Sequence, residues 1–500
     1  MIETLDAVLP IASFVTFALL TVPVIKAVRK TAHKTALTFA WFLAAFVVGF
    51  FTVANLALKY YALPPEQGFV NLPLTVPPGS SLAPISSAFM IDGVSVYMAV
   101  IFTAVSAVVF MYSVFWVDPS KRPSERYYAI MLILVGALIG AVFSGDLLTM
   151  FIFWEAAAAG SSFLMLYRKT PRSLNATLKY LVMIIVASAF VVFGLSLLYG
   201  LTGSLNFWVV KSALATLTDK TVLVLAFIFI AAGYAIESAI VPFHFWLPDA
   251  YAAAPASSSA FLSALIDQGS YYVLIRVLLF IITPTGALDW TIMLAVMAAF
   301  TMVVGNLFAL IQDDVKRLIG NICVADVGYN LVGITSVTSL GITGNLYFFL
   351  IGGITTALSF MAVGIINHYG FRSLEDFSGI GRKMPLAALA LSLAAFSFAG
   401  IPPFGGFTAK FLVFTSAIEG GMTWLAVIGV LMSVVQTAYL FRLINYMYAR
   451  KPKDDVRIKE PKRLLVPVFI LAGTILVLGL YPQIVFNLID PVIKQFPLIL

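Results

Sequence analysis

The chain has 500 residues, of which 61% are hydrophobic and only 11% are charged. About fourteen apolar stretches approach the ~20 residues that a helix needs to cross a bilayer, and they are too long and too uniformly apolar for the strands of a barrel. The composition therefore excludes a membrane β-barrel and predicts an all-α polytopic membrane protein. The only cysteine, Cys323, excludes an intrachain disulfide framework and a cysteine-rich zinc or iron–sulfur site.

Motifs for nucleotide or metal chemistry are missing from the sequence. It contains no GxxxxGK[ST], no GxGxxG after a strand and no HExxH, and its three histidines are scattered. We therefore expect no cofactor and no metal in this chain, and no nucleotide-driven pumping by it alone. It would be a transport component rather than a catalyst of covalent chemistry.

The distribution of the basic residues indicates how the chain is oriented in the membrane. The predicted spans lie near residues 7–28, 36–60, 92–116, 127–144, 147–167, 175–200, 221–247, 257–282, 288–311, 315–336, 340–367, 385–416, 422–448 and 464–486. Lys and Arg fall mostly in alternate loops, with seven of them between Arg450 and Arg463. By the positive-inside rule these loops face the cytoplasm and both termini lie outside a cytoplasmic membrane. The net charge of +7 is thus an orientation signal, and we expect lipid rather than nucleic acid as its partner.

The segments outside the spans are short. Glu3 and Asp6, rather than a basic stretch, precede the first span, which predicts a retained helix and not a cleaved signal peptide. Residues 62–90 are rich in Pro, Gly and Ser and predict an external connection. Residues 201–220 predict a shorter one with an amphipathic segment from Phe207 to Leu217. Neither is long enough to form a domain.

Prolines interrupt the seventh and twelfth predicted spans. Pro242 lies in AIESAIVPFHFWLPDAY, and Pro402 and Pro403 lie in FAGIPPFGGFTAKF. Proline removes a backbone donor and frees a carbonyl, which a membrane tolerates where protein or water satisfies the loss. The breaks are therefore candidate binding or conduction elements. The alternative is that prolines are simply common in transmembrane helices.

The two breaks are five spans apart, which predicts two copies of a five-helix unit. Because five is an odd number, the second copy would be inverted in the membrane, as in many secondary transporters. We expect four parts: residues 1–120 with the first three helices and the loop 62–90, a first repeat at 121–284, an inverted second repeat at 285–449, and a basic loop with the last helix at 450–500.

Five ionisable side chains lie deep within apolar spans: Glu155, Glu237, Asp267, Asp326 and Lys410. Charge inside a membrane is costly and is usually paired, hydrated or functional. A file of such groups with water between them can pass protons, because each group responds to its neighbour's charge. The alternative is a static polar network that orders the bundle.

The surroundings of the acids suggest partners. Glu155 could form a salt bridge with Lys179 in the next span. Glu237 precedes Pro242 by about one and a half helical turns, so its carboxylate would lie beside freed carbonyls that suit water or a cation; a permanently protonated acid is the alternative. Asp267 precedes Arg276 by nine residues, about 13 Å along a helix, so the two are not direct partners.

The remaining positions lie far from the surface charges. Asp326 follows Lys316 by ten residues, and Lys410 follows Pro403 by seven. A lysine this deep within a span more often relays protons than serves only to fill space in the structure.

Several runs of residues resemble a known family. They are WEAAAAGSS, LKYLVMIIVASAF, VPFHFWLPDAYAAAPASSSAFLSAL, DDVKRLIGNICVADVGYNLVGI and AGIPPFGGFTAKFLVF. Together they resemble the antiporter-like subunits of respiratory complex I, of Mrp-type Na+/H+ antiporters and of energy-converting membrane-bound hydrogenases and sulfur reductases. The resemblance covers residues 92–448 and implies fourteen helices, with two inverted five-helix repeats and broken helices seven and twelve. The chain would lack the long lateral helix of the largest members.

The resemblance also implies roles for single residues. Glu155 matches the family's essential helix-five glutamate, Lys410 its helix-twelve lysine, and Lys179 a frequent helix-six lysine. Three positions depart from the pattern: the chain has Glu237 in place of a helix-seven lysine, Gln268 in place of a helix-eight lysine, and Asp326 where a histidine is common. Glu155 beside Glu237 would repel unless one is protonated or a cation lies between them. Lys179 could then become the main partner of Glu155.

Three hypotheses remain open. In the first, the chain moves H+, with Na+ as a coupled ion, inside a redox-driven complex whose other membrane subunits and peripheral redox subunits carry iron–sulfur clusters and, in one branch, nickel–iron. The residues within the quoted motifs favour the hydrogenase, sulfur reductase or Mrp branch over complex I. In the second, the chain is a non-conducting scaffold of such a complex. In the third, it is a self-sufficient symporter with a roomy substrate cavity.

Overall fold

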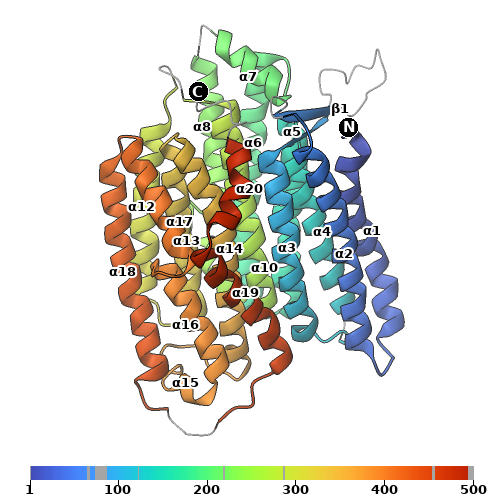
Figure 1. Ribbon diagram of the computed structural model, residues 1–500, viewed down its shortest axis with the longest axis vertical. Coiled ribbons are helices and arrows are strands. Elements are labelled where there is room, and N and C mark those ends of the chain that lie inside the picture. The colour runs from blue at the N-terminus through green and yellow to red at the C-terminus, as the bar shows by residue number, and fades with distance from the viewer. Residues whose placement is uncertain are drawn as a thin grey trace.

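The long apolar stretches form helices that run side by side along one axis of the molecule (Figure 1). This arrangement follows from the need to satisfy backbone groups within each segment when lipid offers no hydrogen-bond partner. The computed structural model describes residues 2–64, 68–73, 87–121, 123–217, 220–284, 288–452 and 457–493.

The N-terminal part contains three helices and a small sheet: α1 (Thr4–Val28), α2 (Lys34–Tyr61), β1 (Phe69–Pro73), β2 (Ala88–Asp92) and α3 (Gly93–Trp116). The two strands pair antiparallel, with Phe69 opposite Asp92 and Pro73 opposite Ala88. The predicted connection 62–90 thus contains β1 and most of β2, two short strands that its many turn-forming residues did not indicate. Residues 74–86 of this predicted loop lie outside the described part of the chain.

The middle of the chain contains these elements: α4 (Ser124–Phe143), α5 (Leu147–Met165), η2 (Leu166–Arg168), α6 (Pro171–Thr202), α7 (Phe207–Thr216), α8 (Thr221–Glu237), α9 (Trp246–Ala253), α10 (Ala256–Phe261), η3 (Leu262–Ile266), α11 (Asp267–Ile275) and η4 (Arg276–Ile281). The elements from α10 to η4 form one continuous span in which η3 and η4 are π-helical. The amphipathic segment predicted near Phe207 is confirmed as α7.

The C-terminal half contains α12 (Thr291–Leu310), α13 (Val315–Thr335), α14 (Ser339–His368), α15 (Ile380–Lys383), α16 (Pro385–Ala399), α17 (Gly405–Glu419), α18 (Thr423–Tyr448), α19 (Lys462–Leu480) and α20 (Gln483–Ile493). The predicted span 464–486 is wrong at its end, since α19 stops at Leu480 and α20 follows as a separate helix. Pro482 explains the break, because proline disfavours helical geometry in the residue before it.

Local sequence explains many of the helix starts. Asp146 accepts a hydrogen bond from the Thr149 amide at 2.7 Å, and Asp314 accepts one from the Arg317 amide at 3.1 Å. Such side-chain caps satisfy backbone donors that have no partner within the helix. α6 and α16 each begin with proline, whose missing N–H costs nothing at that position.

Within the described ranges, 12 helices are long and apolar enough to cross a membrane. The two other predicted spans are those interrupted by proline, which the structure divides into α8 with α9 and α16 with α17. The sequence-based expectation of an all-helical polytopic membrane protein is thus confirmed. The small sheet lies at one end of the bundle (Figure 1).

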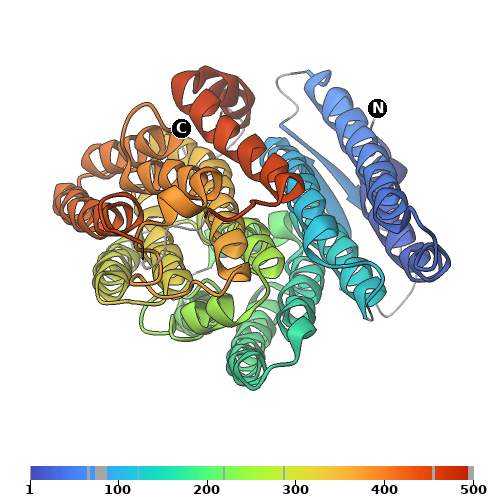
Figure 2. The ribbon, with the colours of Figure 1, turned by 90° about the horizontal axis from the view of Figure 1, so that it is seen from below.

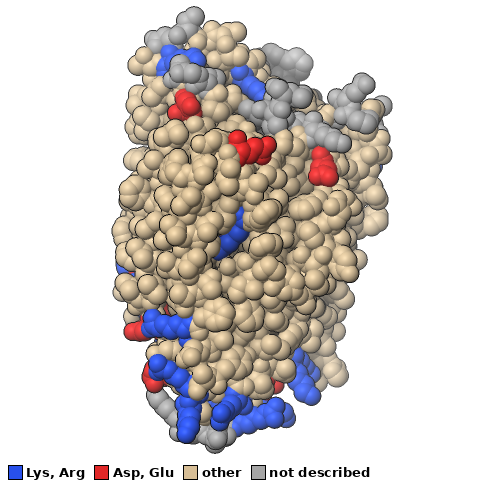
Figure 3. Space-filling view, turned by 60° about the vertical axis from the view of Figure 1, so that its left-hand side comes forward, with Lys and Arg blue, Asp and Glu red and all other residues tan. Residues whose placement is uncertain are grey.

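The two ends of the bundle differ. The start of α1 and the end of α20 lie at the end that carries β1 and α7 (Figure 1), and most of the visible Lys and Arg residues gather at the opposite end (Figure 3). Between the two ends the visible surface carries few charged residues, as a lipid-facing surface requires. Seen along the bundle, α1 and α2 flank α3 and α4, while α19 packs against α3 and α14 (Figure 2).

The most buried helices occupy the centre. The span Ala256–Ile281 and α13 are buried along their whole most apolar stretch, and α14 is nearly so. Three of the predicted site residues, Asp267, Gln268 and Asp326, lie on these helices. These three polar side chains therefore face protein rather than lipid.

Candidate functional site

The first helix break lies at the end of α8. This helix ends at Glu237 and α9 begins only at Trp246, with a cis Val241–Pro242 peptide bond between them. The Trp246 indole N–H donates to the Ile236 carbonyl at 3.0 Å, which satisfies one group freed by the break. The predicted break is confirmed, but it starts at Glu237 itself and not one and a half turns later.

The second break separates α16 from α17 and is also confirmed. It contains a cis Pro402–Pro403 peptide bond and Gly400 at φ +70°, a left-handed conformation that favours glycine. The Lys410 ammonium reaches back across the break and donates to the Phe398 carbonyl at 2.8 Å. The lysine thus binds a backbone group that the interrupted helix leaves without a partner.

The two glutamates of α5 and α8 face each other. Glu155 and Glu237 lie close enough for their carboxyl groups to interact, and the Trp154 indole N–H donates to Glu237. One oxygen of each carboxyl is buried and has no hydrogen-bond partner among the described residues. Two adjacent carboxylates repel when both are ionised, so the pair favours a shared proton or a bound cation.

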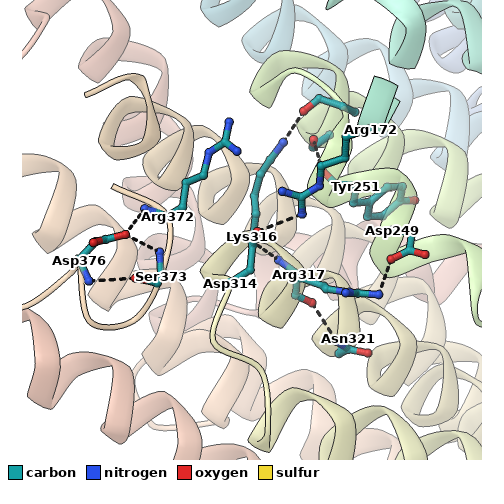
Figure 4. Close-up of polar contacts among 12 residues, drawn as sticks. Arg172, Asp249, Tyr251, Asp314, Lys316, Arg317, Asn321, Arg372, Ser373 and Asp376 are labelled. Carbon is teal, nitrogen blue, oxygen red and sulfur yellow. Dashed lines mark hydrogen bonds and ion pairs between the residues drawn. The ribbon is translucent and has the colours of Figure 1, made fainter. Parts of the chain in front are cut away.

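Lys179 does not pair with Glu155, so the possible Glu155–Lys179 salt bridge is not formed. Lys179 instead donates to Asp249 at 2.8 Å, and its side chain remains 62% exposed. Arg317 binds the other oxygen of Asp249 (Figure 4). The sequence offered no sign that Asp249 would attract both cations, because the contact joins α6, α9 and α13.

Asp267 and Gln268 lie on the central span directly after the π-helical segment η3, and π-helical turns are often found at functional sites. The Tyr251 hydroxyl donates to Asp267. The Gln268 amide nitrogen makes only a 3.5 Å contact with the Ser263 carbonyl, and its oxygen is buried without a partner among the described residues. Both side chains are thus available to other groups on the protein interior.

The prediction that Asp267 is not a direct partner of Arg276 is confirmed. The Arg276 guanidinium binds Asp92 through two hydrogen bonds of 2.6 Å, and its Nε donates to the Tyr272 hydroxyl at 2.8 Å. This buried pair fastens the start of α3 to the end of the central span.

Lys410 and Asp326 form the other end of the site. Lys410 is 5% exposed, contacts the face of the Tyr329 ring at 4.4 Å and donates to Gln436. Asp326 interacts electrostatically with Lys410 and lies near Gln436, whose amide nitrogen is buried without a hydrogen-bond partner among the described residues. Lys410 is therefore the group that interacts with both the acid of α13 and the amide of α18.

Neutral groups connect the two ends. Tyr180 lies within electrostatic range of Glu155, Glu237 and Asp267. Cys323, one helical turn before Asp326, lies within range of both Asp267 and Asp326. We use the name polar axis for the resulting series, which runs in this order: Glu155, Glu237, Tyr180, Asp267, Cys323, Asp326, Gln436 and Lys410.

Little open space accompanies the polar axis near its lysine end. A cavity lined by Asp326, Thr355, Ser397 and Lys410 has a volume of only about 10 Å³. That volume is at the lower limit for a single water molecule. The structure therefore holds this part of the axis almost closed.

Sequence reasoning missed the uncharged members of the site. These are Trp154, Tyr180, Tyr251 and Gln436. Gln436 was visible as an amide within an otherwise apolar span, which is a usable signal. The aromatic residues gave none, because tyrosine and tryptophan are common in membrane helices. Within the described ranges, no group of three or more His, Cys, Asp and Glu side chains is placed to hold a metal ion.

The fold and the polar axis define a polytopic helical membrane protein with two discontinuous helices and ionisable groups between them. Residues 144–436 match the family model described as NADH:quinone oxidoreductase/Mrp antiporter, TM. The chain belongs to this family, as the runs quoted above indicated.

Two curated relatives support the assignment. Subunit N of the NADH-quinone oxidoreductase of Heliobacterium modesticaldum is 33% identical over 398 residues, which cover 79% of this chain and 83% of the relative. Subunit N of the F(420)H(2) dehydrogenase of Methanosarcina mazei is 32% identical over 410 residues, which cover 80% of this chain and 83% of the relative.

Solved structures share the fold over nearly the whole chain. A chain of the membrane-bound sulfane sulfur reductase, an archaeal respiratory membrane complex, has a TM-score of 0.86 and 26% identity over 98% of this chain and 97% of that one. A chain of the Mrp complex from Dietzia sp. has a TM-score of 0.84 and 22% identity over 99% and 98% of the two chains. The second likeness shows the fold alone.

Proposed function

We propose that this chain is the antiporter-like subunit of a multi-subunit, redox-driven ion pump and that it moves H+ along the polar axis. The observation that carries the proposal is the continuity of the axis. Ionisable groups from five separate spans lie in one series, with hydroxyl, thiol and amide groups within electrostatic range of them. A static ion pair would need only two of these spans.

The chemistry follows from the order of the groups. The Glu155–Glu237 pair accommodates one proton between two carboxyls, and adding or removing that proton changes the charge felt by Asp267 through Tyr180. Asp326 and Lys410 respond to the charge on Asp267 in turn. Because the pair consists of two acids, Na+ can take the place of the proton there, which keeps Na+ as the coupled ion of the proposal.

The assembly and orientation are part of the same proposal. The chain would lie in the cytoplasmic membrane beside other membrane subunits and peripheral redox subunits that carry the iron–sulfur clusters. Both termini would face outside, which is supported by the start of α1 and the end of α20, both of which lie opposite the basic end of the bundle. The likeness to the sulfane sulfur reductase supports that branch, whereas the two subunit N relatives support the quinone-linked complexes. The subunits that copurify with the chain decide between these branches.

We further propose fourteen membrane crossings arranged as two inverted repeats, 121–284 and 285–449, between the segments 1–120 and 450–500. The two confirmed breaks, five spans apart, support this division. Each places a polar side chain against a carbonyl that the interruption frees: Trp246 in the first repeat and Lys410 in the second.

The test replaces Lys410 in the assembled complex. Lys410→Ala should abolish ion pumping while the complex assembles and its peripheral subunits still transfer electrons. Lys211→Ala, which removes a lysine from α7 at the surface of the bundle, is the matched control and should pump normally. Pumping at the wild-type rate in the Lys410→Ala complex would contradict the proposal.

A scaffold without conduction is the second candidate function. The observation that favours it is the binding of Lys410 to three acceptors, Phe398, Ser433 and Gln436, together with the nearly closed cavity beside it. Under this hypothesis Lys410→Ala would leave pumping unchanged. The self-sufficient symporter is disfavoured because the cavity at the axis has no room for a solute.

A further inference from the structure

A cavity of about 190 Å³ opens at the basic end of the bundle, away from the polar axis. There the last turns of α3 and α14 meet the first turns of α6 and α13. The volume is many times the ~10–15 Å³ needed to hold one water molecule, so a phosphate-sized group fits.

The lining of the cavity is strongly cationic. Four basic side chains line it, and Asp314 is the one carboxylate among its described lining residues. The four are Arg168, Arg172, Lys316 and Arg372. Arg172 is paired with Asp314 at 3.0 Å, which leaves three cations in excess. Such a concentration of positive charge in a concave site attracts anions.

Lys316 forms the floor of the cavity. It is only 6% exposed, and its ammonium donates to the Ala254 carbonyl at 2.5 Å. Figure 4 shows it between the side chains of Arg172 and Arg372. An ammonium has three donors, and no carboxylate among the described residues pairs with this one. Asp314 lies within electrostatic range of Lys316, but its carboxylate is in an ion pair with Arg172. The buried ammonium therefore has no ion-pair partner of its own, and an anion in the cavity would supply one.

The mouth of the cavity is accessible. Arg168 and Arg372 are both exposed, and neither guanidinium is in an ion pair within the described part of the chain. Arg168 lies over the Trp116 ring at 5.9 Å, which orients it at the rim. Guanidinium groups bind phosphate oxygens through paired N–H donors, and a compact ammonium adds a point charge beneath them.

We propose that this cavity is a binding site for a phosphate-bearing anion, with Lys316 at its floor and Arg168 and Arg372 at its mouth. The anion is either a phospholipid headgroup or a free phosphate compound. Basic pockets between helices at the cytoplasmic end of a bundle suit headgroups. The site is separate from the polar axis and does not depend on whether the axis conducts.

The test uses the full-length chain, purified in detergent and freed of bound lipid. Its melting temperature and binding are measured with three probes: inorganic phosphate, soluble short-chain phosphatidylglycerol, and a short-chain glycolipid without phosphate. We expect the glycolipid to have no effect. Stabilisation by phosphate and phosphatidylglycerol alike assigns the site to phosphate itself, and stabilisation by phosphatidylglycerol alone assigns it to a headgroup.

Variants locate the binding. Arg168→Gln with Arg372→Gln, which alters only exposed side chains, should weaken binding about tenfold or more, as expected for lost charge-assisted hydrogen bonds. Lys316→Met should do the same if it folds. Lys169→Gln, which removes an equal charge next to Arg168 but outside the cavity, should bind like the wild type. The proposal is overturned if neither phosphate-bearing probe binds, or if the double variant binds as tightly as Lys169→Gln.

Discussion

Replacing Arg276 by methionine should destabilise the protein more than the loss of any exposed ion pair. The Arg276 side chain is 0% exposed, and its partner Asp92 is 11% exposed. Asp92 also caps α3 by accepting from the Ser95 amide at 2.9 Å. The change would leave a buried carboxylate with that amide as its remaining described partner. Breaking a buried ion pair in this way costs about 3–5 kcal/mol.

The comparison pair is Arg450 with Glu375, whose side chains are 45% and 62% exposed. Arg450→Met should cost no more than about 1 kcal/mol. The assay is reversible unfolding of the purified subunit in mixed micelles with increasing denaturing detergent. Adding Asp92→Asn to Arg276→Met should recover part of the loss, because asparagine still caps the helix and carries no charge. Equal costs for Arg276→Met and Arg450→Met would show that burial does not set the contribution of the Arg276–Asp92 pair to stability.

Three further outcomes are expected. Gly400→Ala should lower the free energy of unfolding more than Gly421→Ala in the same assay. Both residues have a positive φ, so alanine at either position adds about 1–2 kcal/mol of backbone strain. Only at Gly400 does the new Cβ also meet the Lys410 side chain, at 3.2 Å. Lys179→Met should leave pumping by the assembled complex near the wild-type rate, because this side chain is 62% exposed and does not contact the glutamate pair. Gln436→Leu should slow pumping about tenfold or more, because it removes the charge-assisted hydrogen bond from Lys410. Gln436→Glu keeps an acceptor for Lys410, so this variant should pump faster than Gln436→Leu.

Local chemistry made the helix breaks predictable. Pro242 and Pro402 each remove a backbone donor, and the structure interrupts the helix at both places. The ionisable positions were equally visible, because charge is rare in apolar spans. Their partners were not, since Trp154 and Gln436 reach the site across helix contacts that leave no trace in the local sequence.

Competition between partners explains the main error at the site. A lysine in α6 and a glutamate in α5 are neighbours along the chain, which suggested a pair. Asp249 of α9 lies nearer to Lys179 in space, and binding there keeps the ammonium exposed at the bundle surface. Because an exposed ammonium avoids the free-energy cost of burial, pairing of Lys179 with Asp249 is favoured over pairing with Glu155.

The acid pair Glu155–Glu237 at one end of the polar axis carries the transported charge in the proposed function. The most direct measurement is the number of ions moved per electron by the whole complex in proteoliposomes, with Glu237→Gln compared with Glu375→Gln. Glutamine keeps the size of the side chain but cannot be ionised. Glu237→Gln should lower the ratio while electron transfer and assembly persist, and Glu375→Gln should leave it unchanged. An unchanged ratio in Glu237→Gln would show that the acid pair does not carry the transported charge.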